Sequence, residues 1–208
     1  MVLKTYYPLP KFPPISLSGT QCRLNCRHCN REYLRGMRPA TTPEALVALA
    51  RRLKAQGAHG VLLSGGSDHD GGILNLPAML DAIHRIKAET GLILNIHPGL
   101  VDAATARALA PQNDGVDFAS LEIPGDATIR DVFGLDATRA DYLATYHRLR
   151  DAGVNVVPHV AVYDGTEDHL LAGLEAAALE VTEVIIFSPT PDTPLAEATP
   201  PTPAMVGG

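Results

Sequence analysis

Residues 42–63, TPEALVALARRLKAQGAHGVLL, contain a helix pattern followed by a strand pattern, and this pair sets the fold. Thr42 and Pro43 are residue types preferred at the N-cap and the first position of a helix. Leucines then recur at helical spacing as far as Gly57, which predicts one apolar face. The short apolar run at 60–63 is typical of a buried strand.

The same alternation continues along the chain. Strands are predicted at residues 14–18, 60–63, 92–96, 117–123, 154–162 and 183–187. Helices are predicted at residues 42–57, from 77 onward, and at 102–110, 139–152 and 167–180. Strands that are apolar almost throughout, separated by helices, indicate a parallel sheet covered on both faces. We therefore expect an α/β fold, a (βα)6 partial TIM barrel whose chemistry lies at the carboxyl ends of its strands.

The C-terminal part differs from the rest in composition. We expect residues 1–188 to form the barrel core and residues 189–208 to form a tail, because six prolines lie between positions 189 and 203. The chain stops where a sixth helix would begin, so we expect a partial barrel that lacks its last helix and a chain that is truncated. The alternative is a short extended tail, since proline disfavours a helix but suits a linker.

Composition excludes several classes of partner. A formal net charge of −6 and the lack of a dense Lys and Arg run do not favour a nucleic acid. No stretch approaches the roughly 18 apolar residues that span a bilayer, and the N-terminus lacks a signal-peptide core. We therefore expect a cytoplasmic protein that binds neither a membrane nor a nucleic acid.

All three cysteines of the chain lie in residues 19–30, GTQCRLNCRHCN, directly after the first predicted strand. Cys22, Cys26 and Cys29 have the spacing C-x3-C-x2-C. Three thiolates can hold three irons of a [4Fe-4S] cluster and leave the fourth iron open to a small molecule. The alternatives are a Cys3His zinc site, with His28 or a distant histidine as fourth ligand, and three unrelated reduced thiols.

This cysteine pattern resembles that of the radical S-adenosylmethionine (SAM) superfamily. The resemblance implies a (βα)6 partial barrel with a [4Fe-4S] cluster and SAM as cofactors. It implies that SAM is cleaved to a 5'-deoxyadenosyl radical, which abstracts hydrogen from a small-molecule or cofactor-precursor substrate. An electron donor such as ferredoxin or flavodoxin is the implied partner.

Three stretches resemble the biotin-synthase-like branch: ISLSGTQCRLNC at 15–26, VVPHV at 156–160 and SPTPDTPL at 188–195. Asp192 stands where that branch has a glycine. Sulfur insertion in this branch uses a second cluster, and no cysteine remains to bind one. The alternatives are therefore one subunit of a two-protein, lipoyl-type sulfur-insertion synthase, with a second subunit as partner, or a non-catalytic zinc or iron-sulfur scaffold.

The resemblance also implies SAM contacts in two loops. His28 stands before the third cysteine, where the family often has an aromatic residue near the adenine of SAM. Gly65, Gly66 and Ser67 follow the second predicted strand, where the family has a Gly-Gly-Glu motif. Ser67 lacks the carboxylate of that motif, so it would bind the amino group of SAM more weakly.

Further candidate cofactor-binding residues lie at or after later strands: Asn95, His97, Ser120, Glu122, Arg130 and His159. Ser120 and Glu122 alternate on one strand and should share a face. Arg130 could instead form a surface ion pair with Asp126 or Asp131.

His159 could equally be a satisfied core histidine. A third class of function, a barrel enzyme using acid-base chemistry through His97, Glu122 and His159, stays open, and no catalytic residue is assigned.

Overall fold

The computed structural model describes residues 8–162, 179, 183–186 and 190–199. The strands are β1 Pro14–Ser16, β2 Arg38–Pro39, β3 Gly60–Ser64, β4 Ile93–Ile96, β5 Phe118–Glu122, β6 Val156–Val162 and β7 Glu183–Ile186. The helices are α1 Glu32–Arg35, α2 Pro43–Ala55, α3 Leu76–Thr90, α4 Ala103–Ala108 and α5 Arg139–Asp151. A 3-10 turn, η1, spans Pro111–Asn113, and a π-helical segment, η2, spans Thr128–Phe133.

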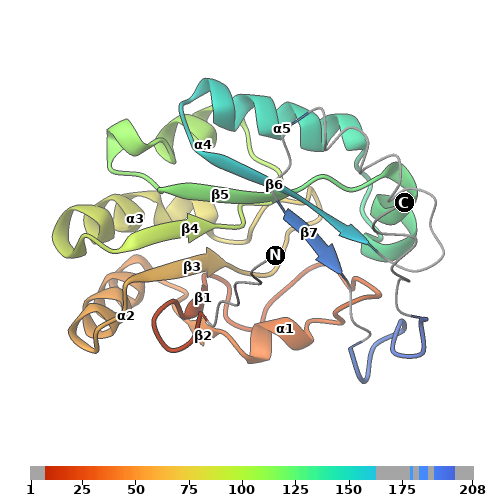
Figure 1. The fold of residues 1–208 in the computed structure, drawn as a ribbon, viewed down its shortest axis with the longest axis horizontal. Helices are drawn as coiled ribbons and strands as arrows, with labels where there is room; N and C mark the ends of the chain where they lie inside the picture. The colour runs from red at the N-terminus through yellow and green to blue at the C-terminus, as the bar shows by residue number, and fades with distance from the viewer. Residues whose placement is uncertain (1–7, 163–178, 180–182, 187–189, 200–208) are drawn as a thin grey trace, which may run out of the picture.

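All seven strands form one parallel sheet in the order β2-β1-β3-β4-β5-β6-β7. The sheet curves from β1 and β2 up to β5 and β6, and β7 lies beyond β6 on the open side (Figure 1). The predicted α/β class and the six predicted strands are confirmed, and the curved parallel sheet fits a partial barrel. Parallel strands bring the carboxyl ends of β1, β3, β4, β5 and β6 to one edge, where the site forms.

The helix starts follow the capping residues in the sequence. The Thr42 side chain accepts a hydrogen bond from the Ala45 amide at 3.2 Å, as its N-cap position predicts. The Asp102 side chain accepts one from the Thr105 amide at 2.7 Å. Helix α3 begins one residue before the predicted proline.

The N-cap of α3 also ties the helix to the sheet. This residue, Asn75, has a φ of 68° and donates from its side chain to the Leu17 carbonyl at 3.0 Å. The bond holds the start of α3 against the end of β1.

Three short elements were not predicted: α1, β2 and η2. Strand β2 pairs with β1 at only two positions, and α1 has four residues, so neither has the length that gives a periodic pattern. The helix predicted at 167–180 and the last residue of the sixth predicted strand, Phe187, lie largely or wholly outside the described residues.

Aliphatic side chains fill the space between the helices and the sheet. Leu46 from α2, Ile83 and Ile86 from α3 and Leu94 from β4 are all fully buried. Among the described residues, none of the helices has the length and hydropathy that crossing a membrane requires.

One ion pair connects α3 to the amino end of β5. Lys87 Nζ lies 2.7 Å from both carboxylate oxygens of Asp117, and Asp117 also accepts the Leu94 amide at 2.8 Å. Both charged side chains are about 70 % shielded from solvent, with 27% and 30% exposed. The pair therefore fixes the start of two neighbouring strands.

Candidate functional site

The site begins where the loops after β1 and β3 cross. Ser18 accepts a hydrogen bond from the Gly66 amide at 2.7 Å and donates one to the Gln21 carbonyl at 2.7 Å. A Cβ at Gly66 would overlap the Gln21 carbonyl oxygen and would lie 2.5 Å from the Cys22 Cβ. Position 66 is therefore a glycine because the cysteine loop packs directly on its backbone.

Backbone groups of Ser67 hold the first cysteine. The Ser67 amide donates to the Cys22 sulfur at 3.3 Å, and the Ser67 carbonyl accepts from the Arg23 amide at 2.8 Å. An amide that donates to a sulfur stabilises the thiolate form, which is the form that binds metal. The Ser67 backbone, rather than its hydroxyl, makes these contacts.

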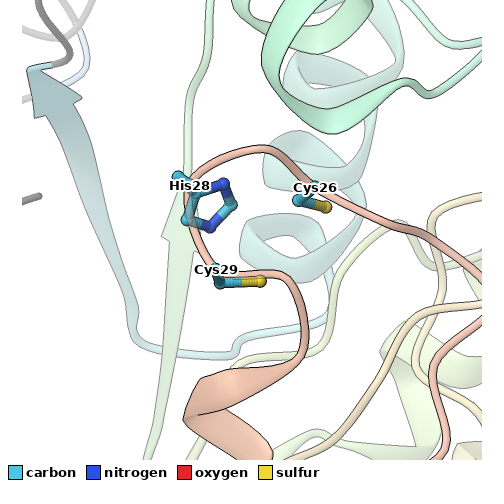
Figure 2. A group of neighbouring side chains, drawn as sticks. All are labelled: Cys26, His28 and Cys29. Carbon is cyan, nitrogen blue, oxygen red and sulfur yellow. The ribbon is translucent and has the colours of Figure 1, made fainter. Parts of the chain in front are cut away.

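The second and third cysteines lie on the next turn of the same loop. Figure 2 shows Cys26, His28 and Cys29 on this turn, and their potential ligand atoms all lie within 4.8 Å of one another. A hydrogen bond from Cys26 lowers the pKa of the Cys29 thiol to about 4, and the same contact raises the pKa of Cys26. One negative charge is therefore shared here at neutral pH, which suits a cationic metal centre.

Segment η2 supports this turn from outside. The Arg27 amide donates to the Val132 carbonyl at 2.7 Å, and the Cys26 thiol donates to the Phe133 carbonyl at 3.6 Å. The His28 ring lies 5.5 Å from the Phe133 ring, centroid to centroid. Residues more than a hundred positions apart thus fix the cysteine loop.

A cavity of about 250 Å³ lies inside the loop, and most of the predicted site residues line it. The loop contributes Cys22, Cys26, His28 and Cys29. The strand ends contribute Gly65, Gly66, Ser67, His97, Ser120, Glu122 and His159. Three half-buried thiols that face one cavity have the donor chemistry that a [4Fe-4S] cluster requires.

Two predicted site residues are not among the cavity-lining residues. Asn95 donates from its side chain to the Ser120 hydroxyl at 3.0 Å and so positions a residue that does line the cavity. Arg130 forms an ion pair with Asp131 at 2.7 Å, and its side chain is 68% exposed. The structure thus has the surface ion pair that the sequence left as an alternative for Arg130.

The wall across from the cysteines is polar and largely uncharged. The rings of His97 and His159 lie 5.5 Å apart, and burial lowers the pKa of both, that of His159 to about 4. Glu122 pairs in register with His159, so both side chains leave the sheet on the same face. Tyr142 also lines this region, and burial followed by the Glu122 charge raises its phenol pKa. Both imidazoles are therefore neutral at pH 7.

Sequence reasoning missed several cavity-lining residues from η2 and α5, namely Phe133, Leu135 and Tyr142. Gly134, with a φ of 64°, ends η2 and was the one local signal for a helical turn there. Tyr142 sits on a helix with a weakly amphipathic sequence, so its direction depends on how the helix packs.

Residues 190–199 reach back to the cysteine loop. The hydroxyl groups of Tyr33 and Thr190 are 3.0 Å apart, and the Asn30 side chain donates to the Asp192 carbonyl at 3.3 Å. The Leu195 amide donates to the Arg27 carbonyl at 3.3 Å. This part of the predicted tail therefore supports the site directly.

Comparison with known proteins agrees with this geometry. The family model described as the Radical SAM superfamily matches residues 16–177, and the chain belongs to that superfamily. The superfamily consists of enzymes that use a [4Fe-4S] cluster and SAM, and the donor set described above fits that cluster.

Two relatives show how much of a longer protein the chain resembles. Biotin synthase of Syntrophotalea carbinolica is 30% identical over 199 residues, which are 89% of this chain and 59% of that protein. The tRNA-2-methylthio-N(6)-dimethylallyladenosine synthase of Shouchella clausii is 25% identical over 84% of this chain and 36% of that protein. The chain thus spans from about a third to three fifths of these relatives.

Solved structures show the same fold. Methylornithine synthase (PylB) superposes with a TM-score of 0.67 at 22% identity, over 88% of this chain and 55% of that one. Streptococcus suis SuiB bound to S-adenosylmethionine gives a TM-score of 0.64 at 16% identity, over 88% of this chain and 43% of that one. At these identities the similarity concerns the fold alone.

Proposed function

We propose that this chain is the cluster-binding and SAM-binding core of a radical SAM enzyme acting on a small molecule or cofactor precursor. The observation that carries the proposal is the set of three half-buried cysteines facing one cavity at the carboxyl edge of the sheet. When bound, the cluster and SAM supply a 5'-deoxyadenosyl radical that removes a hydrogen atom from the substrate.

The residues of the chain divide the binding work. Cys22, Cys26 and Cys29 bind three irons, which leaves the fourth open to the amino and carboxylate groups of SAM. His28 packs against the adenine, since its ring lies between Tyr33 and Phe133 at 6.0 and 5.5 Å.

The strand ends bind the rest of SAM and the substrate. The backbone of residues 65–67 binds the methionine part of SAM, because its glycines leave the approach open. Ser120 and Glu122, with Asn95 behind them, bind the ribose.

The two neutral histidines, His97 and His159, form the wall that the substrate meets. Neutral imidazoles accept or donate hydrogen bonds without adding charge to a closed cavity. They can orient a substrate without competing with the cluster for negative charge.

The test is anaerobic reconstitution with iron and sulfide, followed by dithionite and SAM, with 5'-deoxyadenosine measured by chromatography. Wild-type protein should form 5'-deoxyadenosine, and Cys26→Ala should not. Asp114→Ala, a change in an exposed turn outside the cavity, is the matched control and should keep wild-type activity. A fully loaded cluster without cleavage of SAM would overturn the proposal.

A structural zinc site is the second candidate, because His28 lies within ligand distance of Cys26 and Cys29. Metal content separates the two. Near four irons and four sulfides per chain supports the cluster, and one zinc that is lost in His28→Ala supports the zinc site.

The remaining partners follow from the same proposal. A one-electron donor such as ferredoxin or flavodoxin reduces the cluster, and a second subunit is needed if the reaction inserts sulfur, because the chain has no further cysteine. We propose a cytoplasmic setting and no nucleic-acid substrate, in line with the net charge of −6.

A further inference from the structure

We propose that the outer face of the cysteine loop is the docking surface for a small acidic one-electron redox protein. On this surface Arg23 and Arg31 direct the partner to Cys22. This inference rests on the proposed function, since a chain without a redox cluster would have no use for such a partner.

The positive charges of the chain are concentrated around its cysteines. The net charge is −6, yet residues 23–38 contain five arginines and a single carboxylate, Glu32. The five are all exposed: Arg23, Arg27, Arg31, Arg35 and Arg38. The cysteine loop and the short elements after it therefore form a basic face on an acidic protein.

Neighbouring carboxylates neutralise only part of this basic face. Asp68 pairs with Arg23 at 3.1 Å, and Glu32 pairs with Arg35 at 3.1 Å. Across residues 8–162 and the other described positions, the three remaining arginines of the face form no salt bridge. Exposed cations without carboxylate partners are available to an incoming acidic surface.

A surface crevice connects this basic face to the first cysteine. The crevice has a volume of about 440 Å³, and Cys22, Arg23, Arg31 and Asn75 are among its lining residues. Cys22 and Arg31 also line the inner cavity, so they lie between that cavity and the surface. The Arg31 side chain is anchored by its Nε, which donates to the Leu24 carbonyl at 3.2 Å.

Charge explains why the partner is an acidic protein of modest size. Clusters of one sign steer an oppositely charged partner during diffusion, and the negative remainder of the chain repels that partner elsewhere. A long nucleic acid would extend past a face of 16 residues onto acidic surface, where it would be repelled. The face therefore suits a compact anion better than a polyanionic chain.

The redox step balances simply. The reduced flavin or iron-sulfur centre of the partner loses one electron, and the cluster held by Cys22, Cys26 and Cys29 gains it. No bond forms or breaks in the transfer, so the docking surface has only to bring the two centres close.

The first test measures binding, which does not depend on catalysis. Reconstituted protein is titrated with oxidised bacterial flavodoxin by calorimetry at 50 mM and at 300 mM salt, for wild type and for the triple variant Arg23→Gln, Arg27→Gln, Arg38→Gln. The variant should bind roughly tenfold more weakly at the lower salt, and the difference should shrink at the higher salt.

The matched control removes three exposed cations from α2 and α4: Arg52→Gln, Lys54→Gln, Arg107→Gln. It carries the same change in net charge and should bind flavodoxin like the wild type. Equal weakening in both triple variants, or no weakening in either, overturns the proposal.

The second test compares two reductants for the formation of 5'-deoxyadenosine. With dithionite the docking variant should match the wild type, and with reduced flavodoxin it should be roughly tenfold slower at limiting flavodoxin. If wild type fails with dithionite, the proposed function fails, while the binding test still decides the docking surface. Tighter binding of total tRNA than of flavodoxin, lost in the docking variant, would make the face a nucleic-acid site and refute the proposal.

Discussion

Replacing Gly66 by alanine should damage the metal site through packing alone. The added Cβ would overlap the Gln21 carbonyl and would lie 2.5 and 2.6 Å from the Cys22 Cβ and Cα. Ordinary contacts start near 3.4 Å, so the backbone that carries Cys22 must move by about 1 Å.

Overpacking of this kind typically costs about 1–3 kcal/mol. If that strain is relieved by displacing Cys22, affinity for the cluster falls by roughly tenfold to a hundredfold. The assay is iron and sulfide content after anaerobic reconstitution at limiting iron, with thermal unfolding recorded on the same samples. Gly66→Ala should bind clearly less iron than the wild type.

Gly36→Ala is the control from the same segment. Its φ is −82° and the nearest atom to its added Cβ is the Tyr33 carbonyl oxygen at 3.8 Å, so nothing has to move. It should load iron like the wild type. Full loading of Gly66→Ala would refute the reasoning that the glycine loop positions the first cysteine.

Three further substitutions test the fold around the site. Thr42→Ala removes the hydrogen bond to the Ala45 amide and should lower the free energy of unfolding by about 1 kcal/mol in urea. Lys87→Met leaves the half-buried Asp117 without its cation and should lower that free energy by about 1–3 kcal/mol. Burial lowers the pKa of His159 to about 4, below its unfolded value near 6.5, so the unfolded state takes up the proton first. Stability should therefore fall by about 2 kcal/mol from pH 7 to pH 5, and His159→Phe should remove this part of the pH dependence.

Each of these expectations has a clear contrary result. An unchanged urea midpoint in Thr42→Ala would mean that the cap contributes nothing to α2. Lys87→Met as stable as the wild type in low salt would show that Asp117 is satisfied by the Leu94 amide alone. The same pH slope in wild type and His159→Phe would place the proton uptake on other groups.

The strands and long helices could be predicted because their patterns are local. Thr42 and Pro43 mark the start of α2, and apolar runs mark each strand, so the α/β class follows without tertiary information. The elements that were missed depend on distant contacts. Segment η2 is fixed by its bonds to the cysteine loop, and two-residue β2 exists only because β1 lies beside it.

The candidate site was predictable to the same extent. Strand ends of a parallel sheet meet at one edge, so His97, Glu122 and His159 could be placed together from the sequence. Whether Arg130 reached the cavity could not be known, because a long exposed side chain pairs with whichever carboxylate is nearest, here Asp131. Tyr142 depended on the packing angle of α5, which no sequence pattern sets.

The most direct test of the account is the electron paramagnetic resonance spectrum of the reconstituted, dithionite-reduced protein with and without SAM. We expect the signal of a reduced [4Fe-4S] cluster that changes when SAM is added, because the three cysteines leave one iron open. No iron-sulfur signal, or a cluster signal that SAM leaves unchanged, would contradict the claim that this chain is the SAM-binding core of a radical enzyme.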